Sequence, residues 1–479
     1  MAGARSLLLR HIRMAVSPSS SSSSAASLRP AAALREALWG RRWMSSEEAK
    51  GRSSTRHRQG RQELPEDRRH RQDQEVSYGI NWAIAGRGVV VRDKVFYNME
   101  TSELQKGGNV YTENLSAIPL HVRGNVTSGN PDVSRAQFAK LLKLVTFHLS
   151  SISSLYVQDG AVGSSMVCDA KVRVISDNPS AVMLLSNILW RTPDRAISHD
   201  TCPLTIYVAN SISTNVRNSL GSGTQYANGF AAADIERSSL ILCGKAFADS
   251  AMLKGALSAL TAPILSARGG LPFPGWLLCF GGSAVMLFAP VDVIKSSGLE
   301  DVLVSTDSGV VVSSNGSSVL FPTKAREPNL LAKPTTAIIV SLDSTDALPT
   351  VSKLSPGQAA YHFLAGYHDG KFVPAYSKGP SPVDPLALAN SLFSYLKEDN
   401  TPAYLINAKN SGKYMDEWIS SFQTLSNTGK ELRRLIEAIL LNNLPDCNHE
   451  DTKVGELKGK YKSFLSGKFG KYLPMEFSF

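Results

Sequence analysis

Along residues 171–441 some segments have the apolar pattern of strands and others have that of helices. Together they predict a fold that contains both. Short runs that alternate polar with apolar residues, or that are rich in Val, Ile and Leu, are typical of strands. Such runs predict strands at 171–176, 204–208, 240–243, 336–342 and 403–407. Apolar positions three to four residues apart predict helices at 181–190, 251–262, 355–366 and 430–441. The alternation predicts an α/β (α+β) protein built in layers.

Prolines predict where several of these helices begin and end. Arg191-Thr192-Pro193 closes the first helix and Pro263 ends the second, because proline lacks the amide hydrogen that a helix interior needs. Pro356 stands in the first turn of the third helix, where that amide has no helical partner in any case.

The longest apolar stretch runs from Gly275 to Val291 and is interrupted in its middle by Gly281, Gly282 and Ser283. A helix that crosses a membrane needs about 20 consecutive apolar residues, and this stretch is shorter than that. It therefore predicts a buried strand, a turn and a second strand, and we expect no membrane span.

Charge is distributed unevenly between the first 75 residues and the rest of the chain. The chain has 51 Lys and Arg against 41 Asp and Glu, a net charge of +10. Residues 1–75 contain 15 of the basic and 8 of the acidic residues, which leaves a net charge of only +3 for the remainder. A basic folded part would favour a nucleic-acid partner. Since most of the excess charge lies before residue 76, we expect no nucleic-acid partner.

Residues 1–45 have the composition of an organellar transit peptide. Five arginines precede the first acidic residue, Glu36, and serines fill positions 19–24. The segment 41–46 (Arg-Arg-Trp-Met-Ser-Ser) is similar to a mitochondrial processing site. We expect this leader to direct the chain to the mitochondrial matrix; a chloroplast address and a plain basic tail are the alternatives. Residues 46–78 are charged and contain few apolar residues, so they predict a disordered linker.

The five cysteines stand far apart, without the Cys-x-x-Cys spacing of a zinc or iron–sulfur site. This usage fits a reducing compartment in which thiols remain free. The five are Cys168, Cys202, Cys243, Cys279 and Cys447.

Several blocks of sequence follow one another in the order of a known enzyme family. The most specific is Gln358-Ala-Ala-Tyr-His-Phe-Leu-Ala-Gly-Tyr367, which comes just after Pro349-Thr-Val-Ser-Lys-Leu354. In residue type and spacing these blocks resemble ATP-dependent phosphoenolpyruvate carboxykinase, which converts oxaloacetate and ATP into phosphoenolpyruvate, carbon dioxide and ADP in gluconeogenesis. The blocks are 171–193, 204–207, 244–255, 349–367 and 403–412.

The resemblance covers most of residues 110–475 in patches, and it implies a two-domain carboxykinase-like fold. An N-terminal α/β domain would occupy 79–265. A C-terminal domain at 266–479 would derive from a P-loop mononucleotide-binding domain.

The family's reaction uses a P-loop, in which glycine-rich backbone and a lysine hold the nucleotide phosphates and a hydroxyl binds magnesium. The resemblance implies that Gly281, Gly282 and Ser283 are the remnant of this loop. Where further glycines, a lysine and a threonine are then required, residues 284–288 are Ala, Val, Met, Leu and Phe. Since Leu287 cannot balance phosphate charge, we expect no cofactor here, although the family uses ATP with manganese or magnesium.

Two positions that the resemblance assigns to substrate also differ from the family. Gly129, in the turn Ser128-Gly129-Asn130-Pro131, replaces an arginine that binds oxaloacetate. Leu253 replaces the first of two adjacent active-site lysines, and Lys254 is the retained second one. A solvated lysine without a role in binding is the alternative for Lys254.

The metal-binding positions implied by the resemblance are incomplete. Arg268 stands where the family has a metal-binding histidine, and an arginine cannot bind a cation. Asp307 and Asp301 are the two candidates for one member of a metal-binding aspartate pair. Lys254 and Asp307 are therefore the candidate metal-site residues, and a plain turn residue is the alternative for Asp307.

The basic run 453–471 contains interleaved aromatic residues, among them Tyr461 and Phe464. RNA and a membrane surface are possible partners for such a run, but a solvated amphipathic helix like the family's C-terminal helix is the preferred interpretation. His362, in the most specific block, is expected to pack in or cap its helix.

These replacements predict a pseudoenzyme. Loss of one preorganised electrostatic group typically slows an enzyme by about 10²–10³, and such losses are not additive. We expect a structural or regulatory subunit that works with other mitochondrial proteins. The alternatives are an active carboxykinase with a rearranged site, and a protein that binds a nucleotide or dicarboxylate without catalysis.

Overall fold

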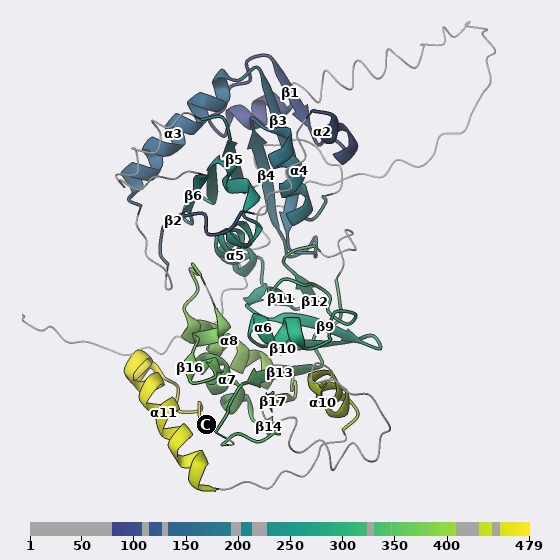
Figure 1. Ribbon diagram of the computed structural model, residues 1–479, viewed down its shortest axis with the longest axis vertical. Helices are drawn as coiled ribbons and strands as arrows, with labels where there is room; N and C mark the ends of the chain where they lie inside the picture. Colours follow the sequence, from purple (N-terminus) through teal and green to yellow (C-terminus); the bar gives the residue numbers. More distant parts are fainter. Residues whose placement is uncertain are drawn as a thin grey trace, which may run out of the picture. The chain divides into compact units, whose positions relative to one another are not determined.

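Strands and helices alternate along the described chain (Figure 1). The computed structural model describes residues 79–107, 115–126, 133–192, 203–212, 228–322, 330–345, 347–377, 379–408, 431–442 and 451–479. The predicted transit peptide at 1–45 and linker at 46–78 lie outside these residues. Residues 64–479 cluster as a single unit, and the predicted boundary between 265 and 266 stays a prediction.

The first half contains a mixed sheet of seven strands in the order β1-β3-β4-β5-β7-β6-β2. β4, β5 and β7 run parallel, whereas β3 pairs with β4 and β6 with β7 in antiparallel fashion. The central strands are buried along their whole length, which explains their continuous apolar runs. The strands are β1 (Lys94–Tyr97), β2 (Leu120–Arg123), β3 (Ser154–Val162), β4 (Ala170–Ser176), β5 (Leu204–Ala209), β6 (Gly229–Asp234) and β7 (Ser239–Gly244).

Helices cover both faces of this sheet. α2 (Thr101–Gly107), α4 (Pro179–Ile188) and α5 (Ser250–Ala267) share one apolar core with it. α3 (Arg135–Ser151) and a short helix at 79–85 share the core on the other face. A capping box at Ser134 and Gln137 fixes the start of α3.

α5 continues past Pro263, so the predicted stop at that residue is wrong. Leu265, two residues further on, is fully buried, and burial of its side chain offsets the hydrogen bond that the proline removes. By length and composition α5 could also cross a membrane. Its buried face, which includes Leu253 and Leu257, packs in the core of the protein.

The second half contains a five-stranded sheet in the order β14-β17-β13-β10-β9. β10, β13 and β17 run parallel, and the two outer strands are antiparallel to their neighbours. The strands are β9 (Trp276–Phe280), β10 (Ser283–Phe288), β13 (Thr336–Ser341), β14 (Val351–Leu354) and β17 (Ala403–Asn407). Smaller sheets are formed by β8 (Leu271–Phe273), β11 (Val310–Ser313) and β12 (Gly316–Val319), and by β15 (Tyr367–His368) and β16 (Lys371–Phe372).

This sheet also lies between two layers of helices. α6 (Val291–Ser296) and α10 (Glu431–Leu440) pack on one face. α7 (Pro356–Ala365), α8 (Pro385–Glu398) and α11 (Asp451–Phe469) pack on the other. Short 3₁₀ turns occur at η3 (Lys245–Ala248), η4 (Pro374–Tyr376) and η6 (Gly470–Tyr472).

The predicted α/β class is confirmed, and each strand and helix predicted above is present within a few residues. The stretch 275–291 forms β9, a turn and β10, as predicted. The finer assignment to a two-domain carboxykinase fold stays a prediction.

Aromatic side chains join α7 to α11 and to the residues after it. Tyr361 stacks on Tyr461, and His362 packs against the rings of both Tyr461 and Phe479. A side chain added at Gly357 would collide with the carbonyl of Glu476, so the chain after α11 passes directly over the start of α7. His362 therefore packs in the core, as expected from the sequence.

A buried ion pair links β3 to β4. Arg173 is completely buried, and its guanidinium donates two hydrogen bonds of 2.7 Å to the carboxylate of Asp159. The hydroxyl of Tyr97, from β1, donates to the same carboxylate at 2.9 Å. A charge at this depth is tolerated only because its partner is fixed beside it.

Replacing Asp159 by alanine should lower the free energy of unfolding by about 3–5 kcal/mol, because the Arg173 charge would stay buried without its partner. Urea denaturation measures the change. The control is Asp399→Ala, which breaks the exposed pair with Lys333 and should cost no more than about 1 kcal/mol. Equal, small losses in both variants would contradict this account.

His362 should make stability depend on pH. Burial lowers the pKa of its imidazole to about 4, from an ordinary value of 6.5. Between these two values the unfolded chain binds a proton that the folded chain does not, so the folded state loses stability as the pH falls from 6.5 towards 4, by about 3 kcal/mol in total. The His362→Phe variant should lack this part of the pH dependence in denaturation curves, and an unchanged slope would argue against it.

Candidate functional site

The carboxyl ends of three parallel strands meet at one edge of the five-stranded sheet. β10 ends at Phe288, β13 at Ser341 and β17 at Asn407. Ligands of open α/β sheets bind at such an edge, in the turns that follow the strands. The residues after these strands therefore form the candidate site.

The turn after β10 leads directly into a helix, which is the order of strand, loop and helix that a phosphate-binding loop needs. Here the turn consists of Ala289 and Pro290, and Pro290 is the N-cap of α6. Ala289 is buried, and proline has no amide hydrogen to offer an anion. The amide of Ile294 donates to the carbonyl of Pro290 at 3.3 Å, so it is used within the helix. Asp292 places a carboxylate in the first turn, which repels a phosphate.

The same segment retains two polar residues at the spacing of a nucleotide-binding motif. In the pattern G-x-x-x-x-G-K-[ST], Ala289 and Ile294 take the places of the two glycines, and Lys295 and Ser296 take those of the lysine and the hydroxyl residue. Ile294 is buried in the core, whereas Lys295 is exposed in the last turn of α6. The Ser296 hydroxyl donates to the carbonyl of Asp292 at 3.0 Å. In this helical form the two residues do not enclose a phosphate-sized space.

The predicted loop remnant at Gly281, Gly282 and Ser283 lies elsewhere. The two glycines form the turn of the β9–β10 hairpin, and Ser283 begins β10. The turn leads into an antiparallel strand and not into a helix, so it has no helix N-terminus to attract phosphate. The buried residues 284–288 belong to β10 itself, which lies between β13 and the outer strand β9. Only the other end of β10, where α6 follows, has the order of strand, turn and helix that such a loop needs.

The turn after β13 holds a buried carboxylate whose acceptor positions are all used within the protein. Asp343 accepts hydrogen bonds from the backbone amides of Thr345, Ala347 and Leu348 and from the Thr345 hydroxyl. Its own amide donates to the side chain of Asn407, at the end of β17, at 3.0 Å. Asp343 and Asn407 therefore fix this turn and are not displayed for a ligand.

The two candidate metal-site residues lie side by side. Lys254, on α5, places its ammonium 2.8 Å from the carboxylate of Asp307, which lies 53 residues later in the chain. Both side chains are 27% exposed. The Asp307 amide donates to the Ser305 hydroxyl, which fixes the turn that carries the carboxylate. Leu253, beside Lys254, is fully buried in the core.

The other implied metal positions are engaged in ion pairs of their own. Arg268, at the C-cap of α5, donates to Asp169 at 2.8 Å, and the ammonium of Lys171 binds the second oxygen of the same carboxylate. Asp301 binds Arg433 through both oxygens, and this arginine holds the pKa of the carboxyl below its usual value. Within the described ranges no three His, Cys, Asp or Glu side chains converge on a common point. Gly129 lies outside those ranges.

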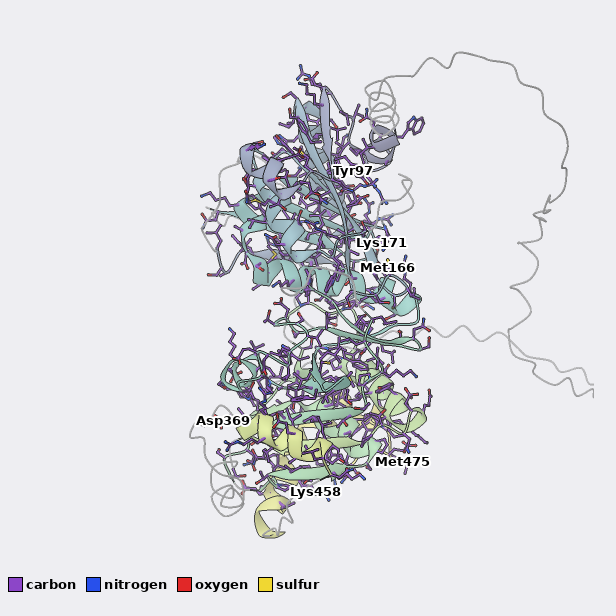
Figure 2. All side chains as sticks on the ribbon, turned by 90° about the vertical axis from the view of Figure 1, so that its right-hand side faces the viewer. Tyr97, Met166, Lys171, Asp369, Lys458 and Met475 are labelled. Atoms are coloured by element: carbon purple, nitrogen blue, oxygen red, sulfur yellow. The ribbon has the colours of Figure 1, made fainter. Side chains whose placement is uncertain are left out.

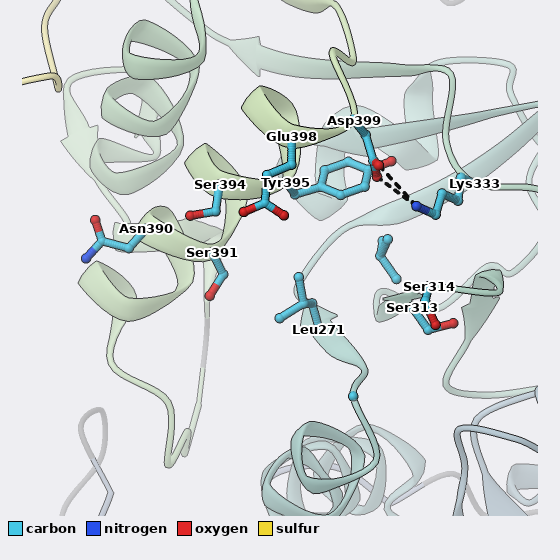
Figure 3. A pocket seen from close by; sticks show the side chains of 12 residues that line it. Leu271, Ser313, Ser314, Lys333, Asn390, Ser391, Ser394, Tyr395, Glu398 and Asp399 are labelled. Atoms are coloured by element: carbon cyan, nitrogen blue, oxygen red, sulfur yellow. Dashed lines mark hydrogen bonds and ion pairs between the residues drawn. The ribbon is translucent and has the colours of Figure 1, made fainter. Parts of the chain in front are cut away.

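A hollow of about 460 Å³ lies between β11 and α8 (Figure 3). Its floor is apolar at Leu271 and Val312, and serines of α8, Ser391 and Ser394, line one side. At its end Lys333 contacts both oxygens of Asp399 at 3.1 Å. None of the motif residues discussed above lines this hollow.

Lys295 and Ser296 are not among the site residues predicted above from the sequence. The signal that could have found them is the strand-forming run 284–288, since a phosphate-binding loop follows such a strand and does not precede it. The contact between Lys254 and Asp307 has no local signal, because the fold alone joins α5 to that turn.

Comparison with known proteins gives one family. A family model described as Phosphoenolpyruvate carboxykinase matches residues 318–458. The chain is similar to Phosphoenolpyruvate carboxykinase (ATP) of Campylobacter jejuni (strain RM1221), with 28% identity over 185 residues, 34% of either chain. The similarity to the protein of the same name from Bradyrhizobium sp. (strain BTAi1 / ATCC BAA-1182) is 28% over 140 residues, 24% of this chain and 26% of that one. The matches thus span about a quarter to a third of these relatives.

If Gly281 and Gly282 serve only as a hairpin turn, their substitution should affect stability alone. Their φ angles are +53° and +88°, and a side chain at either position would meet no other atom. Gly282→Ala should cost about 1 kcal/mol in denaturation experiments, whereas Gly282→Asn should cost less, since asparagine adopts positive φ more readily. An equal cost for both variants would contradict the turn assignment.

Proposed function

The chain is a divergent member of the phosphoenolpyruvate carboxykinase (ATP) family, and from this we propose that it keeps a carboxykinase-like fold without the family's reaction. It serves instead as a structural or regulatory subunit of a larger mitochondrial assembly. The observation that carries this proposal is the turn after β10, where Ala289, Pro290 and Asp292 stand at the position of a phosphate-binding loop.

The residues of this turn do not fit ATP. A phosphate-binding loop offers several free backbone amides and a lysine that points at the phosphates. In this turn Pro290 lacks an amide hydrogen, the amide of Ile294 is used within α6, and Lys295 lies at the far end of that helix. The buried side chain of Ile294 fixes the helical form, because it is part of the core beneath α10. Opening the loop would expose that side chain to water, at a cost of about 1.5–3 kcal/mol.

The surroundings of Lys254 do not fit a divalent cation. The lysine that the family uses beside its metal forms a direct ion pair with Asp307, so the carboxylate already has a cationic partner. Leu253 and Arg268 replace two further groups implied by the resemblance. Loss of one such group typically slows a reaction by about 10²–10³, and several are absent together.

The subunit role is supported by a contrast within the chain: the family model matches part of its core, whereas the ligand-binding positions discussed above differ from the family. The region matched by the family model, 318–458, contains β13, α7, α8 and β17 at the centre of the second half. The leader at 1–45 supports a mitochondrial address. A protein that retains the core of an enzyme, but not its ligand-binding turns, is suited to binding other proteins.

The second candidate is an active carboxykinase that forms phosphoenolpyruvate, carbon dioxide and ADP from oxaloacetate and ATP at a rearranged site. The spacing of Lys295 and Ser296 favours it, because these are the residue types that bind phosphate and metal in the motif. This candidate requires α6 to unwind when the nucleotide binds.

An assay of oxaloacetate decarboxylation with ATP and manganese separates the two candidates. We expect no turnover above a mock preparation, and no shift of melting temperature with ATP, oxaloacetate or malate. The Campylobacter jejuni relative named above is the positive control. Turnover that disappears in the Lys295→Ala variant would overturn the proposal and establish the second candidate.

A further inference from the structure

The two sides of α11 differ sharply in character. Leu457, Tyr461, Leu465 and Phe469 are buried at four-residue intervals and fix the helix to α7. The opposite side is exposed and carries lysines, of which Lys458 is labelled in Figure 2. The interleaved aromatic residues that the sequence placed in this run point mainly inwards, so they are not available to stack on RNA bases.

This exposed side is positively charged. Residues 454–479 contain five lysines and two glutamates. Glu456 is paired with Lys460 at 2.8 Å, and Lys468 lies over the rings of Phe464 and Phe469. In the part of the chain that the structure describes, Lys458 and Lys462 have no carboxylate partner. They lie one helical turn apart, so their side chains project from the same side.

Two large apolar side chains are exposed shortly after α11. Tyr472 is 72% exposed and Met475, which is labelled in Figure 2, is 100% exposed. The ammonium of Lys471 lies 5.7 Å from the ring of Tyr472. Exposed apolar residues beside charged ones are typical of protein-binding surfaces.

The helix also carries exposed glycines that its own fold does not require. A side chain at Gly455, Gly459 or Gly467 would meet no other atom. Glycine in a helix interior costs roughly 0.5–1 kcal/mol relative to alanine. These positions leave the backbone of α11 open to close approach by a partner.

Lys458 and Lys462 have no carboxylate partner among the described residues, and Tyr472 and Met475 are exposed shortly after the helix. From these observations we infer that the exposed side of α11 docks an acidic amphipathic helix of a partner protein. Glutamates one turn apart on that helix would pair with Lys458 and Lys462, and its apolar residues would cover Tyr472 and Met475. The inference rests on the proposed subunit role. A lipid surface fits less well, since the apolar side of α11 is already buried. RNA fits less well because phosphate contacts make no use of Met475.

Amine acetylation with acetic anhydride tests this surface in the native assembly. Lysine reactivity is compared between the purified chain and the assembly isolated from mitochondria, with Lys140 on α3 as the internal reference. We expect Lys458 and Lys462 to react at least fivefold more slowly in the assembly. A carbodiimide should also link them to Asp or Glu residues of a partner protein.

Three results would overturn the inference, and they are distinguishable. If the chain migrates with a larger assembly but both lysines stay fully reactive, only the docking surface is wrong. If ribonuclease restores their reactivity, the occupant is RNA. If the chain purifies as a monomer, the proposed subunit role fails together with the docking surface.

Substitutions then separate docking from folding. Lys458→Glu with Lys462→Glu should reduce association with the assembly about tenfold or more, because like charges would face each other. The matched control, Lys140→Glu with Lys143→Glu on exposed positions of α3, should leave association unchanged. Gly459→Gln should keep or raise the melting temperature while it weakens association. An association unchanged by both α11 variants would overturn the inference.

Discussion

A backbone amide that already donates a hydrogen bond inside a helix or turn is not free to bind an anion, and the carboxyl edge of the five-stranded sheet depends on this constraint. An enzyme that holds phosphate there leaves the amides of the turn free. In this protein the turn after β10 contains a proline, the amide of Ile294 belongs to α6, and the turn after β13 is fixed by Asp343. The groups at this edge are therefore used in the internal hydrogen bonding of the fold, which they help to stabilise.

The apolar side chains near this edge and beside Lys254 are likewise used within the protein. Ile294 fills a place in the core beside α10, and Leu253 does so beneath the seven-stranded sheet. Polar groups held ready for a ligand usually reduce the stability of an enzyme, and their replacement by apolar residues removes that cost. The charges that remain near these positions are paired with each other, as Lys254 is with Asp307 and Arg268 with Asp169. The charges at these positions are thus balanced within the protein.

Much of this fold could be predicted from the sequence, because the spacing of apolar residues and the content of β-branched residues identify buried strands such as β5 and β13. The extension of α5 past Pro263 could not be predicted, since burial of Leu265 outweighs the local tendency of proline to end a helix. The sequence alone does not decide which end of β10 corresponds to a phosphate loop, because two adjacent glycines have the same local pattern whether they end a hairpin or bind a ligand. Only the pairing of β10 with β13 decides between the two ends. The contact of Lys254 with Asp307 depends on tertiary structure, and only the family resemblance, not a local pattern, joins the two residues in the sequence.

The contact between α7 and the chain after α11 has a consequence for the order in which this protein can mature. Tyr361 and His362 are covered by side chains made about a hundred residues later, among them Tyr461. A nascent polypeptide that lacks those residues would expose an aromatic surface that includes the side chain of His362. Chaperones recognise surfaces of this kind, so the second half should depend on them until the whole chain has been synthesised. Proteolytic loss of the residues after α11 would return the molecule to that unfinished state.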